Sequence, residues 1–213
     1  MTPVYLGIDV AGASNTWICV LALGAEGPAI VIPPTKASLV DIVRLADERD
    51  VVAVAIDAQL THAISEETGF RSGDLQLRQL LPPKCRDWVA SQNSLMAVPV
   101  RGRQLADALS PVVGTIIETH PRACLYLGFP ELLDPIRRYK GDAPGAYLTV
   151  LWRAWTGRFG LAQDIPPTLC DGMLDALVCA TVAHLYHMQP GSLRRLRNTS
   201  TDRAGRGPFF VMA

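Results

Sequence analysis

The most constraining feature of this sequence is that three apolar runs each end on an acidic residue. The runs close in the letters GID, AID and IIE, at Asp9, Asp57 and Glu118. Unbroken apolar runs of this length are typical of strands buried within a sheet. A carboxylate beside a buried core is costly unless it is paired or binds a metal. One such acid alone would be expected to cap the following turn or helix, but three strand ends together are harder to explain as caps.

The first part of the chain predicts four strands and one helix. Three β-like runs, Val4–Val10, Thr16–Leu23 and Ala29–Ile32, are separated by short turns, which favours an antiparallel meander. Apolar residues recur at helical spacing over Ser38–Asp50, and the run Val51–Ile56 follows as a fourth strand. A helical crossover to a buried strand implies a sheet of mixed parallel and antiparallel strands.

The second part of the chain predicts one more central strand and several helices. Val112–Ile117 is the fifth expected strand, and proline at position 121 suits the first turn of a helix that follows it. Tyr147–Trp155 and Asp171–His187 have the apolar spacing of helices, and 139–145 is a loop. The apolar end Phe209–Met212 either adds a strand or stays a frayed terminus, after an arginine-rich tail that is expected to be solvated.

Residues 61–112 are expected to be an insertion that borders the site, with helices over 74–81 and 103–109. Residues 1–213 are then one α/β domain, whose mixed five-stranded sheet has the order β-β-β-α-β-α-β-α and is flanked by helices. The length of 213 residues and the 49% of hydrophobic residues are enough for one large core.

Charge and cysteine content limit the classes of function. The formal net charge is zero, which argues against a general polyanion binder, although a neutral protein can still concentrate basic groups along one groove. The five cysteines are scattered and form no C-x-x-C pair, so zinc and redox motifs have no support and a reduced cytoplasm is expected. Neither a signal peptide nor a membrane span is expected, and a dimer is left open.

Two further acids belong to the strongest helical segment. Asp171 and Asp175 are four residues apart and so share one helix face, but Asp171 is also well placed to be the N-cap. Asp175 lies deeper in an apolar stretch and is the better ligand candidate. Four carboxylates without cysteine or histidine spacing suit Mg²⁺ or Mn²⁺. Two such ions about 4 Å apart can activate a water and stabilise a leaving oxygen in phosphodiester cleavage.

The ordered set of motifs resembles the RNase H-like superfamily. The matching segments are YLGIDVA, AIDAQL, IIETHPR, DGMLDALVCA and the closing GPFFVM. Within that superfamily they look most similar to predicted nucleases built on a domain of unknown function, relatives of Holliday-junction resolvases. The resemblance implies metal ligands at Asp9, Asp57, Glu118 and Asp175, with Asp171 as a further candidate. One departure is Gln59, where relatives often have proline.

Three residues are candidates for contact with a substrate. His120 and Arg122 follow Glu118 closely and are expected to line the site, with the guanidinium on a phosphate, unless the THPR segment is only a strand-to-helix turn. Lys140, in the YKGD loop, is a similar candidate. Basic residues of the insertion could form a rim or be ordinary surface groups, namely Arg71, Arg78, Lys84, Arg86, Arg101 and Arg103. His62, His184 and His187 are expected to be structural.

The leading hypothesis is a metal-dependent nuclease that hydrolyses phosphodiester bonds of DNA or RNA by a two-metal carboxylate mechanism. The second is a noncatalytic binding or assembly module with an RNase H-like core, which the neutral charge favours. The third is a small phosphoester hydrolase. The GIDVAGAS segment is also similar to the first phosphate loop of actin-like and sugar-kinase ATPases, but those need two such domains, and this chain is too short for both.

Overall fold

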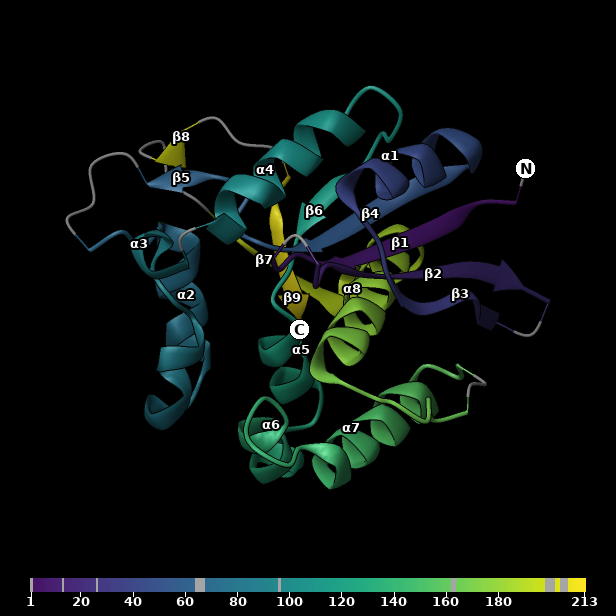
Figure 1. Ribbon diagram of the computed structural model, residues 1–213. Coiled ribbons are helices and arrows are strands. Elements are labelled where there is room, and N and C mark those ends of the chain that lie inside the picture. The colour runs from purple at the N-terminus through teal and green to yellow at the C-terminus, as the bar shows by residue number, and fades with distance from the viewer. Residues whose placement is uncertain are drawn as a thin grey trace.

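The computed structural model describes residues 2–12, 14–25, 27–63, 68–95, 97–161, 164–197, 202–203 and 207–213. In this part of the chain, helices cover both faces of one mixed sheet of seven strands, in the order β3-β2-β1-β4-β6-β9-β7 (Figure 1). The α/β class and the mixed sheet are confirmed. The prediction of five strands is wrong, because the chain's C-terminal part adds β9 and β7 beyond β6.

The sheet begins as the predicted antiparallel meander and then continues in parallel. The strands β1 (Val4–Asp9), β2 (Trp17–Gly24) and β3 (Gly27–Lys36) pair antiparallel. Next to β1, the parallel strands are β4 (Val51–Asp57) and β6 (Ile116–Glu118). The short connection 10–16 reverses the chain, whereas the helix α1 (Leu39–Glu48) carries it back across the sheet to β4. Parallel β1 and β4 therefore end at the same edge.

Two helical layers enclose the sheet (Figure 1). Helices α1 and α4 (Ala97–Leu109) pack over one face, where Ile8, Ile42 and Leu105 belong to one buried cluster. The other face is covered by α5 (Pro121–Gly128) and α8 (Asp171–Met188), and α7 (Gly145–Arg158) packs against α8. The strands β1, β2 and β4 contribute side chains to both cores, because successive residues of a strand point to opposite faces of the sheet.

The remaining elements lie around these layers. Their bounds are α2 (Ser72–Leu80), α3 (Gln92–Leu95), α6 (Leu133–Arg138), the 3-10 turns η1 (Pro83–Trp88), η2 (Pro130–Leu132) and η3 (Pro190–Ser192), and the strands β5 (His62–Ala63), β7 (Leu193–Leu196), β8 (Asp202–Arg203) and β9 (Phe209–Met212). The strands β5 and β8 form a separate two-stranded sheet. The sequence leaves open whether the C-terminal end adds a strand or stays frayed. It adds a strand, since β9 pairs with β6 and β7.

Several predicted boundaries are corrected. The fifth strand does not begin at Val112, because Ser110–Val112 form a turn at the end of α4 and only Ile116–Glu118 pair with β4. Asp171 is the first residue of α8, and Cys170 is its N-cap. Part of the arginine-rich tail is a strand, because Arg194 and Arg195 belong to β7, where both side chains are exposed as expected.

No helix in the described part of the chain is long and apolar enough to cross a membrane. The longest helix, α8, is instead buried along most of its length against β1, β2 and β4. The apolar residues of α8 are therefore part of the hydrophobic core.

Candidate metal centre

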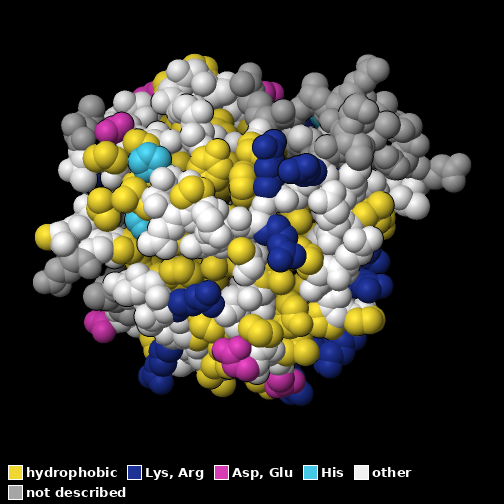
Figure 2. Space-filling model, turned by 180° about the vertical axis from the view of Figure 1, so that it is seen from behind, with side chains coloured by type: hydrophobic (Ala, Val, Ile, Leu, Met, Phe, Trp, Pro, Cys, Tyr) yellow, Lys and Arg dark blue, Asp and Glu magenta, His cyan; other side chains and the backbone are white. Residues whose placement is uncertain are grey.

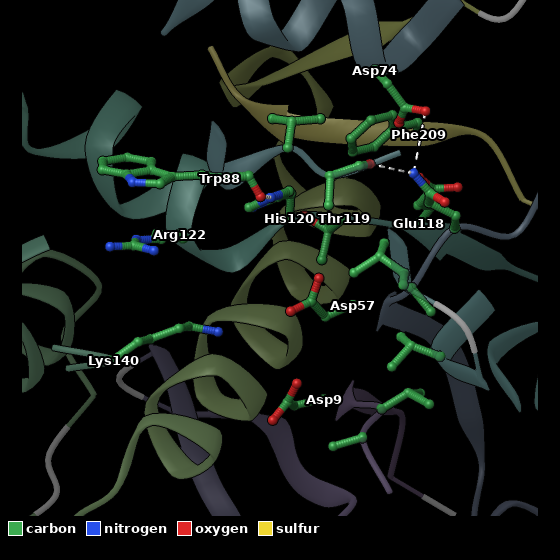
Figure 3. A pocket seen from close by; sticks show the side chains of 18 of the residues that line it. Asp9, Asp57, Asp74, Trp88, Glu118, Thr119, His120, Arg122, Lys140 and Phe209 are labelled. Atoms are coloured by element: carbon green, nitrogen blue, oxygen red, sulfur yellow. Dashed lines mark hydrogen bonds between the residues drawn. The ribbon is translucent and has the colours of Figure 1, made fainter. Parts of the chain in front are cut away.

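Asp9 and Asp57 occupy the same position on neighbouring strands. Asp9 is the last residue of β1 and pairs in register with Asp57, the last residue of β4. In a parallel pair, side chains in register point to the same face, so the two carboxylates lie side by side at the edge of the sheet. Figure 3 shows both at the floor of one cavity. Two adjacent strands thus deliver the first two predicted acids to one point.

Helix α8 adds the third acid from the layer that covers the sheet. Asp175 is fully buried on the first turns of α8, and its carboxylate approaches those of the two strand acids. One oxygen from each of Asp9, Asp57 and Asp175 lies within 4.8 Å of the others, and we call these three residues the acidic triad. The close approach depends on Gly172, where an added Cβ would lie 2.3 Å from the Trp17 ring and 3.0 Å from Oδ2 of Asp9.

Both oxygens of Asp175 have partners. The Tyr139 hydroxyl donates to Oδ1 at 2.8 Å, and the Lys140 ammonium lies 2.5 Å from Oδ2. Tyr139 is fully buried, whereas the side chain of Lys140 keeps 35% of its surface exposed. Lys140 therefore connects the buried carboxylate with the open space of the cavity, and Figure 3 shows its side chain reaching toward Asp57 and Asp9.

Burial and mutual repulsion disfavour the charged forms of the two strand acids. Burial raises the pKa of Asp57 to about 7, and the neighbouring Asp175 and Glu118 add to the rise while Lys140 opposes it. Burial likewise raises the pKa of Asp9 well above its ordinary value, with further contributions from Asp175 and Asp57. A site of this kind gains from any added positive charge, because a cation stabilises the ionised carboxylates.

Lys140 supplies part of that positive charge. Burial alone would lower the pKa of Lys140, but attraction to Asp175, and then to Tyr139 and the strand acids, raises it well above the usual value. The ammonium is therefore charged throughout the neutral range. Asp171 lies at the rim, half-buried, where it lines the same cavity and adds to the repulsion on Asp9.

Glu118 lies in the same cavity but outside the acidic triad. Both of its oxygens accept from the guanidinium of Arg71, and its Oε2 also accepts from the Leu60 amide at 2.8 Å. Arg71 is itself fully buried and also donates to both oxygens of Asp74. Figure 3 shows Glu118 near Asp74, at the far side of Thr119 from the strand acids. The structure thus assigns Glu118 to a buried ion pair instead of grouping it with the other predicted ligands.

His120 and Arg122 line the cavity but are tied to the protein backbone. Nδ1 of His120 accepts from the Ala123 amide at 3.3 Å and caps α5, which leaves the proton on Nε2 for the carbonyl of Trp88 at 3.1 Å. Burial lowers the pKa of His120, which favours this neutral form. Arg122 donates to the carbonyls of Ile136 and Arg137, and its guanidinium lies 4.4 Å from the Trp88 ring centre.

The cavity has a volume of about 310 Å³. It is lined by Asp9 and Asp57 of the acidic triad, by Arg71 with its partners Asp74 and Glu118, and by Trp88. Of the basic residues proposed for a rim, Arg71 lines the cavity as a buried group. Arg78 donates to the backbone carbonyl of Val89, and Arg101 donates to that of Ala11. Sequence reasoning missed Tyr139, Trp88 and the buried role of Arg71. An arginine flanked by Phe70 and a helix start carries no sequence signal for burial.

Basic side chains on one face of the molecule lie apart from one another (Figure 2). On the face seen in Figure 2, Lys and Arg side chains stand among apolar and uncharged side chains and form no continuous strip over its described part. In comparisons with known protein families, curated proteins and solved structures, no match to this chain was found.

Proposed function

We propose that this protein is a divalent-metal-dependent phosphodiester hydrolase whose centre is the acidic triad. The observation that carries the proposal is that carboxylate oxygens from Asp9, Asp57 and Asp175 lie within 4.8 Å of one another beside an open cavity. Burial makes such a gathering unfavourable unless positive charge joins it. The arrangement is then explained by what it binds.

The donors fit Mg²⁺ or Mn²⁺. Carboxylate oxygens are the ligands that these hard ions prefer, and neither a thiol nor an imidazole belongs to the acidic triad. Asp9 and Asp57 would hold the ion, since Asp175 is already engaged by Tyr139 and Lys140. A bound divalent ion supplies Lewis-acid activation of water and of phosphoryl oxygens.

The protein's own groups would orient the substrate and balance its charge. A phosphodiester carries one negative charge, and the exposed part of Lys140 offers an ammonium at the cavity where that charge would enter. In the hydrolysis, the oxygen of water forms a bond to phosphorus and the bond from phosphorus to the leaving oxygen breaks. One proton of the water passes to the leaving oxygen, and the other stays on the new monoester.

Nucleic acid is the proposed substrate class. The RNase H-like resemblance of the motifs around Asp9, Asp57 and Asp175 implies it, and the strand order β3-β2-β1-β4-β6 is compatible with that fold. We propose that the core is RNase H-like and that β9 and β7 extend it. The formal net charge of zero favours a short contact with the phosphate backbone over a long basic track.

The test is cleavage of a substrate panel with Mg²⁺ or Mn²⁺: single- and double-stranded DNA, RNA, a four-way DNA junction and bis-p-nitrophenyl phosphate. We expect cleavage that chelation abolishes and that Asp9→Asn lowers by at least about a hundredfold, because a ligand is lost. The matched control is Asp47→Asn on the exposed surface of α1, which should retain the parent rate.

Other results would favour the alternatives. Cleavage of bis-p-nitrophenyl phosphate alone, with no nucleic acid cleaved, would indicate a small phosphoester hydrolase. Nucleic-acid binding without cleavage, unchanged in Asp9→Asn, would indicate a noncatalytic module. An Asp9→Asn variant that cleaves like the parent would show that the acidic triad is not the active centre.

A further inference from the structure

Two basic side chains of the cavity, Arg71 and Lys140, form ion pairs with acids near the centre. Arg71 is fully buried and contacts both oxygens of Glu118, so that carboxylate is already neutralised. Lys140 lies 2.5 Å from Asp175, the fully buried member of the acidic triad. The acids whose charges these two contacts do not balance are therefore the strand acids Asp9 and Asp57, together with Asp171 at the rim of the cavity.

Asp175 is held in a way that restricts further binding. Its Oδ1 accepts from the hydroxyl of Tyr139 at 2.8 Å, and its Oδ2 faces the ammonium of Lys140. Tyr139 is fully buried and follows directly on α6, so this partner cannot leave without disturbing the core between α6 and α7. Two divalent ions would need Asp175 as a shared or second ligand, in the position that Lys140 occupies.

We propose that this centre binds a single divalent ion, between Asp9 and Asp57, and that the Lys140 ammonium is a tethered second cation in place of a second metal ion. This inference rests on the proposed function and deepens it. The single charge of an ammonium needs no ligand set of its own, and a side chain cannot diffuse away. Lys140 is thus a positioning residue for Asp175 and a contact for the substrate phosphate.

The exposure of Lys140 supports the double contact. A lysine that served the core alone would be covered, but 35% of this side chain remains accessible, and it lines the cavity. An ammonium has three donors, so one can remain on Asp175 while another meets a phosphate oxygen. Arg71 differs, because its guanidinium is fully buried and its contacts to Glu118, Asp74 and Thr61 occupy it.

The experiment counts ions and asks whether Lys140 sets the number. Calorimetric titration with Mn²⁺ should give one ion per wild-type chain, with the six-line electron paramagnetic resonance spectrum of an isolated ion. Lys140→Met removes the ammonium and should admit a second ion per chain, seen as a spin-coupled spectrum. Lys140→Arg keeps the charge and should stay at one ion, as should the control Lys84→Met on the exposed surface.

The possible results distinguish failure of the single-ion proposal from failure of the proposed metal-dependent hydrolysis. Two ions in the wild type, or one ion in a folded Lys140→Met variant, would overturn the single-ion proposal while leaving metal-dependent hydrolysis intact. No Mn²⁺ bound at millimolar concentration, together with no cleavage, would remove the proposed function itself. If Lys140→Met does not fold, the wild-type stoichiometry decides the question alone, because one ion supports the proposal and two overturn it.

Discussion

Gly7 of β1 lies directly against Ala180 of α8, and a Cβ atom at Gly7 would come 2.0 Å from the Ala180 backbone nitrogen. It would also lie 2.2 Å from the carbonyl oxygen of Ala176. The obstacle in both cases is helix backbone, which cannot rotate aside as a side chain can. Because Asp175 is on this helix and Asp9 is two residues from Gly7, the same contact sets the spacing between the helical and strand acids.

Gly7→Ala is therefore expected to push α8 away from the sheet and to lower the free energy of unfolding by about 3 kcal/mol or more, as overpacking of a rigid contact does. Urea denaturation measures this loss, and Mn²⁺ titration of the folded fraction should show weaker binding. Gly157→Ala is the control, because its Cβ would meet open space on the exposed side of α7. Equal stability of Gly7→Ala and wild type would contradict the packing argument.

A second prediction concerns the buried ion pair of Arg71 and Glu118. Arg71→Met leaves the carboxylates of Glu118 and Asp74 buried without their cation, and we expect a loss of about 3–5 kcal/mol in unfolding free energy. Adding Glu118→Gln to Arg71→Met should recover part of the loss, because one uncompensated charge is removed. Thermal or urea unfolding of the single and double variants gives the coupling energy.

The matched control for this pair is Arg44→Met, which breaks an exposed contact with Asp41. It should change the free energy of unfolding by too little to measure. The same variants test the place of Glu118 in the site. Since Arg71 holds both of its oxygens, Glu118→Gln should lower stability while leaving the affinity for Mn²⁺ within about threefold. A loss of Mn²⁺ binding in Glu118→Gln would show that the carboxylate is a ligand after all.

The sequence predicted the acids that adjacent strands and the helix bring together, for reasons that are local. Val4–Ile8 and Val51–Ile56 contain no charged residue, as is typical of strands buried on both faces, so the acids that follow them fall at one sheet edge once a helix connects the strands. The spacing of α8 was equally clear. Asp9, Asp57 and Asp175 follow from these periodicities.

What could not be predicted depends on contacts between distant residues. Glu118 ends a strand like the other two acids, and only the position of Arg71, 47 residues earlier, shows that it is neutralised. Lys140 is a sequence-based candidate for contact with a substrate, but nothing local indicates that it or Tyr139 reaches Asp175. The strand β7 was missed because it is polar along its exposed positions, where Arg194 and Arg195 lie, and its pairing with β9 compensates for the weak pattern.

A third prediction treats His120 as a cap and not as a proton carrier. His120→Ala should lower stability by about 1–2 kcal/mol, since it removes the cap of α5 and the bond to the Trp88 carbonyl. His120→Asn can still accept from the Ala123 amide and should recover about half of the loss. Urea denaturation compares the three proteins. Cleavage by His120→Asn should keep the pH profile of the parent, whereas loss of one titration from that profile would identify the imidazole as an acid or base.

The last prediction concerns the pH dependence of stability without metal. The pKa of Asp57 is about 7 in the folded protein, against an ordinary value of 3.8, so the folded state holds more protons than the unfolded state between these values. This titration lowers the stability as pH rises from about 4 to about 7, and its contribution is complete above that range. The elevated pKa of Asp9 acts in the same direction.

Asp57→Asn removes one of these titrations and isolates its effect. In the presence of a chelator, we expect the variant to be more stable than wild type at pH 7.5 by about 1–3 kcal/mol, and to lose this advantage near pH 4.5. Millimolar Mn²⁺ should raise the wild-type melting temperature at pH 7.5 and have little effect on the variant, because an ion that binds only the folded state stabilises it. Parallel stability curves for the two proteins from pH 4.5 to 7.5 would mean that Asp57 titrates normally and that the strand acids carry no stored repulsion for a cation to relieve.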